Sequence, residues 1–223
     1  MMKSPEQRML SVLRYIMAML GTIPKQGILS SKPYNPILGE EFKCKWDHGA
    51  ENFTVFVSEQ VSHHPPISAF HMENRKKNIM FHGTITPKSK FHGNSLSSIM
   101  DGTIVFRILN YGEEYNMVFP HIVARGVLFG TQCLELTNKL KIQCTQSSYK
   151  ASIRFKSKSN NELEGKVKKG TELVYTLSGC TDTQIMIKHV QKEREMVFLD
   201  RKDMIEPPKI VEPVVRQHKM ESR

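Results

Sequence analysis

Short stretches of alternating apolar and polar residues fill most of the chain from Phe42 onward, and they limit the possible folds more than any other feature. Gly, Asn, Asp or Ser residues separate them, as is typical of short β-strands joined by tight turns. The strands that this pattern predicts are Phe42–Trp46, Phe53–Glu59, Ile67–Met72, Asn78–Thr86, Thr103–Leu109, Tyr115–Phe119, Gln132–Thr137, Leu140–Thr145, Tyr149–Phe155, Glu162–Val167, Leu173–Ser178, Ile185–Lys188 and Met196–Leu199. An antiparallel meander of this many strands must curl or close, because a long flat sheet is unstable and leaves edges that aggregate. The pattern therefore predicts a mainly β fold, a closed or nearly closed antiparallel barrel with room for a large apolar ligand.

The N-terminal residues predict one α-helix. Ser4 suits the N-cap, Pro5 the first helical position and Gln7 the far end of a capping box. Gly21 can end the helix. Apolar residues recur between these ends at helical spacing, at Leu10, Leu13, Met17 and Leu20. Such a stripe more often packs on its own domain than on a membrane.

Turns and irregular segments are indicated at four places. Hairpin turns are predicted at Asn110–Glu113 and at Asn138–Lys139. The segment Gly27–Gly39 carries two prolines and should be extended or looped rather than helical. After Asp200 the chain becomes polar and Pro-rich, which predicts a surface linker or tail.

The composition excludes some classes of protein and leaves others open. No stretch approaches the roughly 18 apolar residues that a membrane-spanning helix needs. The four cysteines are far apart without a CxxC pair, and the start lacks a cleavable signal, so we expect reduced thiols in a cytoplasmic protein. The formal net charge of +10 favours an anionic partner, either nucleic acid, an acidic membrane surface or a phosphorylated ligand.

The first of two segments suited to binding an anion is Ser31–Glu40. It holds Lys32 and Asn35 beside prolines that restrict the backbone. Lys32 supplies a point charge for a phosphate, and Asn35 adds neutral donors and an acceptor. Taken alone, this segment is better explained as a Pro-rich connector with a solvated lysine.

The second segment, Glu59–Ser68, contains the adjacent pair His63 and His64, followed by two prolines. Pro65 disfavours the helical region at His64, so the pair should lie at a strand end with both rings held in place. Protonated histidines donate to a phosphate, and an anion favours that form. Structural histidines, a metal site and a hydrolase are the alternatives, but adjacent histidines seldom reach one ion and no GxSxG motif occurs. We therefore predict no metal, no cofactor and no catalytic residue.

Nucleic acid is the main rival partner for a chain this basic. Basic clusters lie at 75–77, 88–90, 156–158 and 166–169. They lack the interleaved aromatic residues that stack on bases. A membrane-facing or solvated surface explains them better, and we expect no nucleic acid partner.

Both anion-binding segments resemble known signature sequences. Lys32–Glu40 and Glu59–Pro66 are similar to signatures of the oxysterol-binding-protein-related family, and the second resembles its signature at every position. Lys88–Ser95 resembles another recurring stretch of that family, and Met220–Arg223 resembles the lead-in to its C-terminal helical part. The resemblance covers nearly the whole chain in order, and its His-His-Pro-Pro block is highly specific.

The resemblance implies one lipid-binding domain over residues 1–223, a large, incomplete antiparallel β-barrel with an N-terminal helix and a hydrophobic lipid tunnel. Family members bind phosphatidylinositol 4-phosphate and a second lipid, a sterol or another phospholipid such as phosphatidylserine, and exchange them between membranes, often at membrane contact sites. By motif, Lys32 and Asn35 would contact the phosphoinositide headgroup, and His63 and His64 would bind its 4-phosphate. We expect a cytoplasmic protein in peripheral contact with anionic membranes, and not an enzyme.

Some features depart from the family pattern. Family domains are longer, so the lid and the C-terminal Lys/Glu/Arg set are expected outside residues 1–223, in a domain truncated at both ends. A Trp that usually follows the Ser-Gly of one strand is absent, because Cys180 follows Gly179. Lipid transfer is the leading hypothesis. A lipid sensor or scaffold without transfer is the alternative, and an enzyme acting on a phospholipid or nucleotide is a third that no motif supports.

Overall fold

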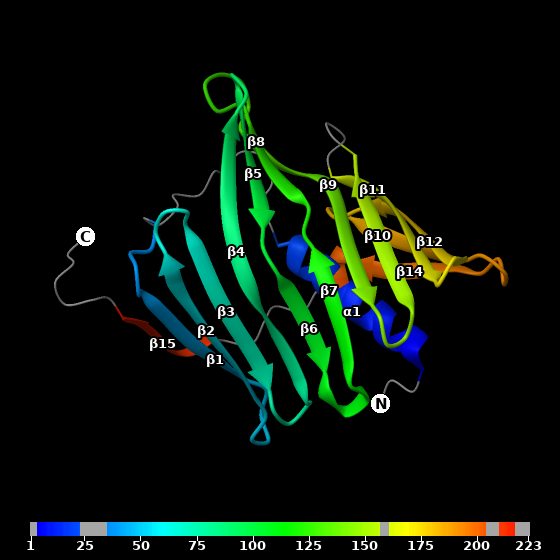
Figure 1. Cartoon of the computed structure of the whole chain (residues 1–223). Coiled ribbons are helices and arrows are strands. Elements are labelled where there is room, and N and C mark those ends of the chain that lie inside the picture. The colour runs from blue at the N-terminus through cyan, green and yellow to red at the C-terminus, as the bar shows by residue number, and fades with distance from the viewer. Residues whose placement is uncertain (1–3, 23–34, 157–160, 204–209, 217–223) are drawn as a thin grey trace. The chain divides into compact units, whose positions relative to one another are not determined.

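The computed structural model describes residues 4–22, 35–156, 161–203 and 210–216, and Figure 1 labels its elements. The chain divides into two compact units. The first unit contains Met1–Lys32, Lys88–Met100 and Met117–Ile205, and the second contains Pro33–Pro87, Asp101–Asn116 and Glu206–Arg223. Both are built on antiparallel strands, which confirms the predicted mainly β fold with one N-terminal helix.

The first unit combines a helix with a sheet. Its elements are α1 (Pro5–Leu20), β5 (Ser95–Asp101), β8 (His121–Arg125), β9 (Cys133–Cys144), β10 (Tyr149–Phe155), β11 (Glu162–Lys169), β12 (Glu172–Cys180), β13 (Gln184–His189), β14 (Glu195–Asp200) and the 3-10 helix η2 (Arg201–Asp203). The strands follow the order β14-β13-β12-β11-β10-β9, and β8 pairs with both β9 and β5.

The helix α1 begins where the sequence predicts, and its first turn is held by the capping box. The Gln7 N–H donates to the Ser4 hydroxyl at 3.2 Å, and the Ser4 N–H donates to the Gln7 side chain at 3.5 Å. The helix packs on β10 and β14, and β10 and β11 bury alternate side chains. The helix contributes four side chains with 0% exposure to this core, Met9, Leu13, Ile16 and Met17.

The second unit is a sheet without an α-helix among its described residues. Its elements are β1 (Glu41–Asp47), β2 (Phe53–Ser62), β3 (Ile67–Asn74), β4 (Ile79–Phe91), β6 (Ile104–Ile108), the 3-10 helix η1 (Leu109–Tyr111), β7 (Glu113–Val118) and β15 (Ile210–Arg216). The strand order is β7-β6-β4-β3-β2-β1-β15. The end of β4, from Lys88 on, and the end of β7, from Met117 on, belong to the first unit.

One face of the second unit carries a continuous row of aromatic rings that crosses six strands. Neighbouring ring centroids lie between 5.2 and 6.5 Å apart, a range in which aromatic side chains attract each other. The row consists of Phe42, Phe56, Phe70, Phe81, Phe106 and Tyr115. Since side chains alternate between the two faces of a strand, His71 and His82 lie on the opposite face.

Three observed strands, β5, β8 and β15, were not expected from the sequence. The prediction of a linker or tail after Asp200 is wrong for Ile210–Arg216, which pairs with β1 as β15. Pro213 falls within the register shift between Lys43 and Lys45 of β1, a position where a residue without an N–H is tolerated. Pairing with a distant strand therefore outweighs the local Pro-rich composition.

The predicted hairpin turn at Asn138–Lys139 is also wrong, because both residues lie inside β9. The first part of β9 pairs with β8 and the rest pairs with β10, and Asn138 has a φ of 69° where the partner changes. The turn predicted at Asn110–Glu113 is confirmed. There, η1 and Gly112, with a φ of 60°, join β6 to β7.

Candidate functional site

The His63–His64 pair lies on the turn that joins β2 to β3. The strand β2 ends at Ser62, and β3 begins at Ile67, so the two histidines and two prolines form the tip of a hairpin. Both imidazole rings are exposed, and their centroids are 4.5 Å apart with planes at 64°. The predicted place at a strand end is thus observed, and both rings can be reached by a ligand.

Gln60 joins this hairpin to the segment that contains Asn35. Its backbone carbonyl accepts from the Gly39 N–H at 2.8 Å, and its own N–H donates to the Glu40 carbonyl at 3.1 Å. Glu40 also stabilises the segment just before β1, because its carboxylate accepts a hydrogen bond from the Ile37 N–H at 3.1 Å. The two predicted anion-binding segments therefore meet at one end of β2.

The Gln60 side chain is buried, with 4% exposure, and fixes the shape of the hairpin end. Its amide nitrogen donates to the Ser62 carbonyl at 2.7 Å, and its amide oxygen accepts from the Ser68 hydroxyl at 2.5 Å. The strand register shifts between Gln60 and Ser62. Gln60 was not predicted as a site residue, and the only sequence feature that could have indicated its role is a polar amide three positions before His63.

Of the other two predicted site residues, the structure describes Asn35 but not Lys32. Asn35 is exposed and lies two residues before the Ile37 N–H that binds Glu40. Lys32 lies outside the described residues. The structure thus joins the end of β2 that leads to His63 and His64 to the segment after Asn35, and the position of the Lys32 side chain stays a prediction.

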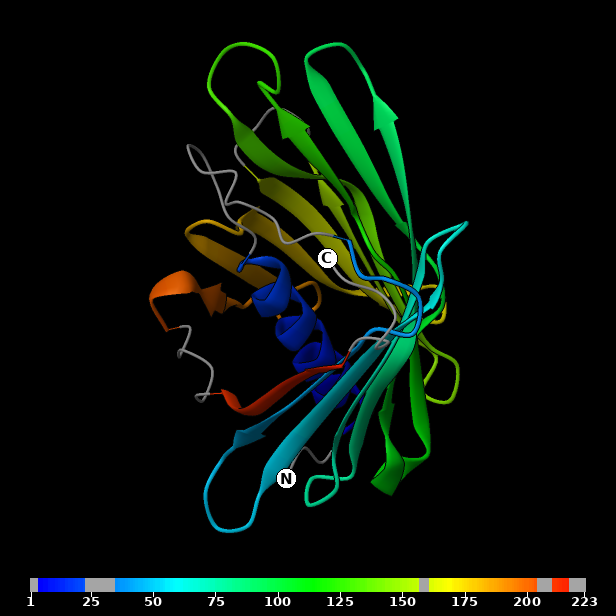
Figure 2. The same cartoon turned by 90° about the vertical axis from the view of Figure 1, so that its left-hand side faces the viewer.

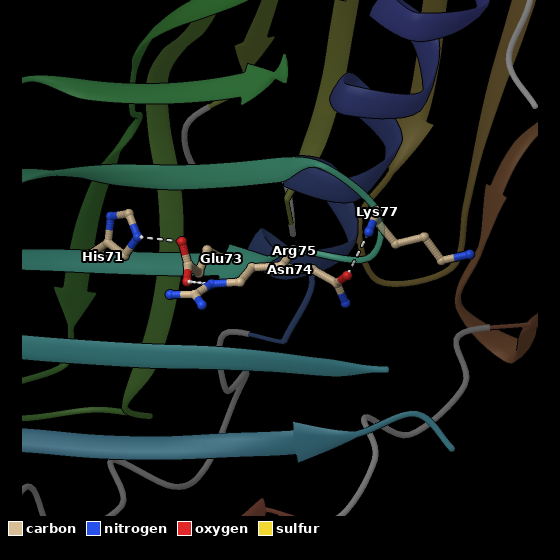
Figure 3. Close-up of polar contacts among 5 residues, drawn as sticks. All are labelled: His71, Glu73, Asn74, Arg75 and Lys77. Atoms are coloured by element: carbon tan, nitrogen blue, oxygen red, sulfur yellow. Dashed lines mark hydrogen bonds and ion pairs between the residues drawn. The ribbon is translucent and has the colours of Figure 1, made fainter. Parts of the chain in front are cut away.

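A second polar cluster occupies the other end of β3, and Figure 3 shows its five residues. Glu73 binds Arg75 Nε at 2.8 Å and lies 3.5 Å from His71 Nε2. The hydrogen bond from Arg75 lowers the pKa of the Glu73 carboxyl and His71 adds to this effect, while partial burial opposes it. Asn74 accepts from the Lys77 N–H at 2.9 Å, which fixes the turn into β4. The Glu73 carboxylate is already paired with Arg75 and His71, so we do not assign this cluster to a ligand.

His82 lies beside this cluster, on the same face of the sheet as His71, and the two ring centroids are 6.2 Å apart. Burial, followed by the nearby Arg107 and His71, lowers the pKa of the His82 imidazole. Within the described ranges, its buried Nε2 has no hydrogen-bond partner. A neutral ring suits this position.

Among the residues that the structure describes, no group of three or more His, Cys, Asp or Glu side chains is arranged to hold a metal ion. No described helix has both the length and the apolar character needed to cross a membrane.

A family model described as "Oxysterol-binding protein" matches residues 1–221. The chain belongs to the oxysterol-binding protein family. Human oxysterol-binding protein-related protein 5 is 43% identical over 189 residues, which are 81% of this chain and 21% of that protein. Oxysterol-binding protein 10 of Dictyostelium discoideum is 34% identical over 92% of this chain and 53% of its own length. The chain thus spans about a fifth to a half of these two relatives.

Solved structures of the family have the same fold. The Osh1 ORD domain in complex with ergosterol has a TM-score of 0.74 and 27% identity, over 86% of this chain and 46% of that chain. The Osh3 ORD of Saccharomyces cerevisiae in complex with PI(4)P has a TM-score of 0.62 at 21% identity, over 86% and 48%, and this likeness concerns the fold alone. The family resemblance and the fold class that the sequence predicts are therefore confirmed.

Proposed function

We propose that this chain binds phosphatidylinositol 4-phosphate and a second lipid, a sterol or phosphatidylserine, and transfers them between membranes. The observation that carries the proposal is the junction at Gln60, where the two family signature segments meet. A sterol is a natural candidate for the second lipid, because the related Osh1 domain was solved with ergosterol and with cholesterol. Transfer is driven by lipid gradients and needs no chemical step, so we propose that the chain is not an enzyme.

In this proposal Lys32, Asn35, His63 and His64 bind the lipid headgroup. Two exposed imidazoles on one turn offer N–H donors to the 4-phosphate, and a bound phosphate favours their protonated form. Asn35 adds an amide, and Lys32 adds a fixed positive charge by motif. Gln60 acts as a positioning residue, since it holds both segments without facing solvent.

The apolar part of the lipid requires a surface that can be shielded from water. Burial of apolar surface contributes about 25 cal/mol per Å², which would supply most of the affinity for a sterol or an acyl chain. In the second unit the partly exposed members of the aromatic row, Phe42, Phe56 and Phe70, offer such a surface. We propose that it lines the lipid tunnel, that residues 1–223 act as one lipid-binding domain, and that the protein works in the cytoplasm in peripheral contact with anionic membranes.

Transfer of phosphatidylinositol 4-phosphate between liposomes tests the headgroup assignment. The variant His63→Ala/His64→Ala should transfer this lipid about tenfold more slowly or worse, because hydrogen bonds to a charged phosphate are worth about 1.5–3 kcal/mol each. The matched control is His48→Ala, an exposed histidine on the turn at the other end of β2. Its rate should equal that of the unmodified chain.

Equal transfer by the His63→Ala/His64→Ala variant and the unmodified chain would refute the headgroup assignment. Native mass spectrometry separates binding from transfer. Bound phosphatidylinositol 4-phosphate without any liposome transfer would favour the alternative, a lipid sensor or scaffold.

A further inference from the structure

Hydrogen bonds from Asn94 join two loops of the first unit, and Figure 2 shows both loops at the top. They are the turn between β4 and β5, residues 92–94, and the loop between β8 and β9, residues 126–132. Asn94 links them: its side-chain oxygen accepts from the N–H groups of Leu128 at 2.9 Å and Phe129 at 3.1 Å, and its amide nitrogen donates to the Phe129 carbonyl at 2.8 Å. We call these two loops, with the end of β4 from Lys88 on, the Asn94 tip.

The 126–132 loop of the Asn94 tip is compact at its base. Gly126 has a φ of +67°, and a Cβ atom there would lie 2.4 Å from the Thr131 carbonyl oxygen. The two ends of the loop therefore touch, and only glycine fits at this position. The hydrogen bonds to Asn94 fix the backbone at Leu128 and Phe129, so this part of the loop has a defined position.

The apolar side chains of the Asn94 tip face water. Phe91 is 55% exposed, Leu128 65% and Phe129 70%, and the last two are the most exposed large apolar side chains in the described ranges. Single exposed apolar residues are common, but a group of large exposed apolar side chains marks an interaction site.

The charged side chains within the two stretches that form the tip are basic. Lys88 and Lys90 are exposed at the end of β4, and His92 follows them. Neither stretch 88–100 nor stretch 126–134 contains an Asp or a Glu. Apolar side chains that project past lysines match the water–lipid interface of an anionic membrane, where the chains enter the acyl boundary and the ammonium groups meet phosphates.

We propose that the Asn94 tip docks the protein onto an anionic lipid bilayer, with Leu128 and Phe129 inserted and Lys88 and Lys90 at the lipid phosphates. A stable protein interface usually takes about 20 to 30 residues from each partner, whereas a bilayer can accept a few projecting side chains without a complementary surface. The proposal names the surface that makes the peripheral membrane contact proposed above and rests on that proposal, but docking itself requires no lipid in the tunnel.

Vesicle flotation tests this docking with vesicles of phosphatidylcholine and phosphatidylserine that contain neither sterol nor phosphatidylinositol 4-phosphate. The variant Leu128→Ser/Phe129→Ser should bind about tenfold less for each side chain removed, because each gives up the burial of a large apolar group. The matched control is Leu109→Ser/Tyr111→Ser, which alters side chains that are 49% and 39% exposed on the turn between β6 and β7, next to Glu113 and Glu114. The control should bind like the unmodified chain.

The charge of the tip is tested with Lys88→Gln/Lys90→Gln. This variant should lose binding to vesicles with phosphatidylserine and change little on pure phosphatidylcholine, and added salt should reduce the difference. His63→Ala/His64→Ala should still float with the vesicles, so a failure of the headgroup assignment is distinguishable from a failure of docking.

Two results would overturn the docking proposal. One is undiminished flotation of Leu128→Ser/Phe129→Ser at an unchanged melting temperature, which would assign membrane binding to another surface. The other concerns Phe129→Trp, whose fluorescence should shift to the blue on vesicle binding relative to the unmodified chain with its single Trp46. A vesicle-bound Phe129→Trp protein with an unshifted spectrum would place the side chain in water.

Discussion

At the scale of single residues, Glu6 links the helix of the first unit to its sheet. Its carboxylate accepts from the Tyr149 hydroxyl at 3.4 Å and from the Tyr175 hydroxyl. Burial, together with the neighbouring carboxylate, raises the pKa of both tyrosines. These contacts join residues more than 140 positions apart in the sequence, so Glu6 links helix α1 to strands β10 and β12.

We expect Glu6→Ala to lower the free energy of unfolding by about 2 kcal/mol, because two partly buried hydroxyls lose a charged acceptor. Urea denaturation followed by circular dichroism measures this change. The control is Asp203→Ala, an exposed acidic residue in η2, which should change stability by less than about 0.5 kcal/mol. Equal effects of the two substitutions would show that the tyrosine contacts contribute nothing.

At the scale of elements, strands β10 and β11 place like charges opposite each other. Lys150 faces Lys168 across the pair, and both side chains are exposed. Directly opposite like charges destabilise a sheet, and opposite charges stabilise it by about 0.2–1 kcal/mol. Both strands alternate buried and exposed side chains, so a substitution at an exposed position tests the charge without disturbing the core.

Lys150→Glu should therefore raise the free energy of unfolding by about 0.5 kcal/mol at low salt, and the gain should shrink as salt screens the charges. Urea denaturation at two salt concentrations checks both statements. The matched control is Lys188→Glu on β13, where the residue opposite is Glu195 of β14, so this substitution should destabilise the protein. The same sign for both substitutions would contradict the role of the cross-strand charges.

At the scale of the whole molecule, the shifted pKa values predict a loss of stability on both sides of neutral pH. Because the pKa of His82 is lowered in the folded chain, this imidazole binds a proton more readily in the unfolded chain. The free energy of unfolding therefore falls as the pH drops below the ordinary value of 6.5. Glu73 adds a further loss below its ordinary value of 4.5. The raised pKa values of Tyr149 and Tyr175 have the opposite consequence, because stability falls as the pH rises past 10.0.

Urea denaturation across this pH range measures the profile, and tyrosine absorbance should show that the phenols with a raised pKa, Tyr15, Tyr149 and Tyr175, ionise late. His82→Phe should flatten the step nearest pH 6.5, whereas His48→Phe at an exposed turn should leave the step in place. A step unaffected by His82→Phe would assign it to another group.

Much of the local structure follows from the sequence. The capping box at Ser4 specifies the start of α1, and the period-two pattern predicts β10 with its observed ends, because each signal depends on neighbours along the chain. The strands β5 and β8 were not predicted. They pair with each other although they are not consecutive in the chain, and their residues do not alternate between apolar and polar strongly enough to indicate a strand.

The sequence by itself determined the mainly β class, the N-terminal helix and the family, and it supplied the residues of the proposed headgroup site, since these rest on periodicity and on contiguous motifs. Only the tertiary structure decided which segments meet. It showed that Gln60 joins the two signature segments, that Asn94 binds the loop carrying Leu128 and Phe129, and that β15 pairs with β1. Such contacts form between residues far apart in the chain, where no local preference specifies the partner and pairing of strands and burial of side chains select it.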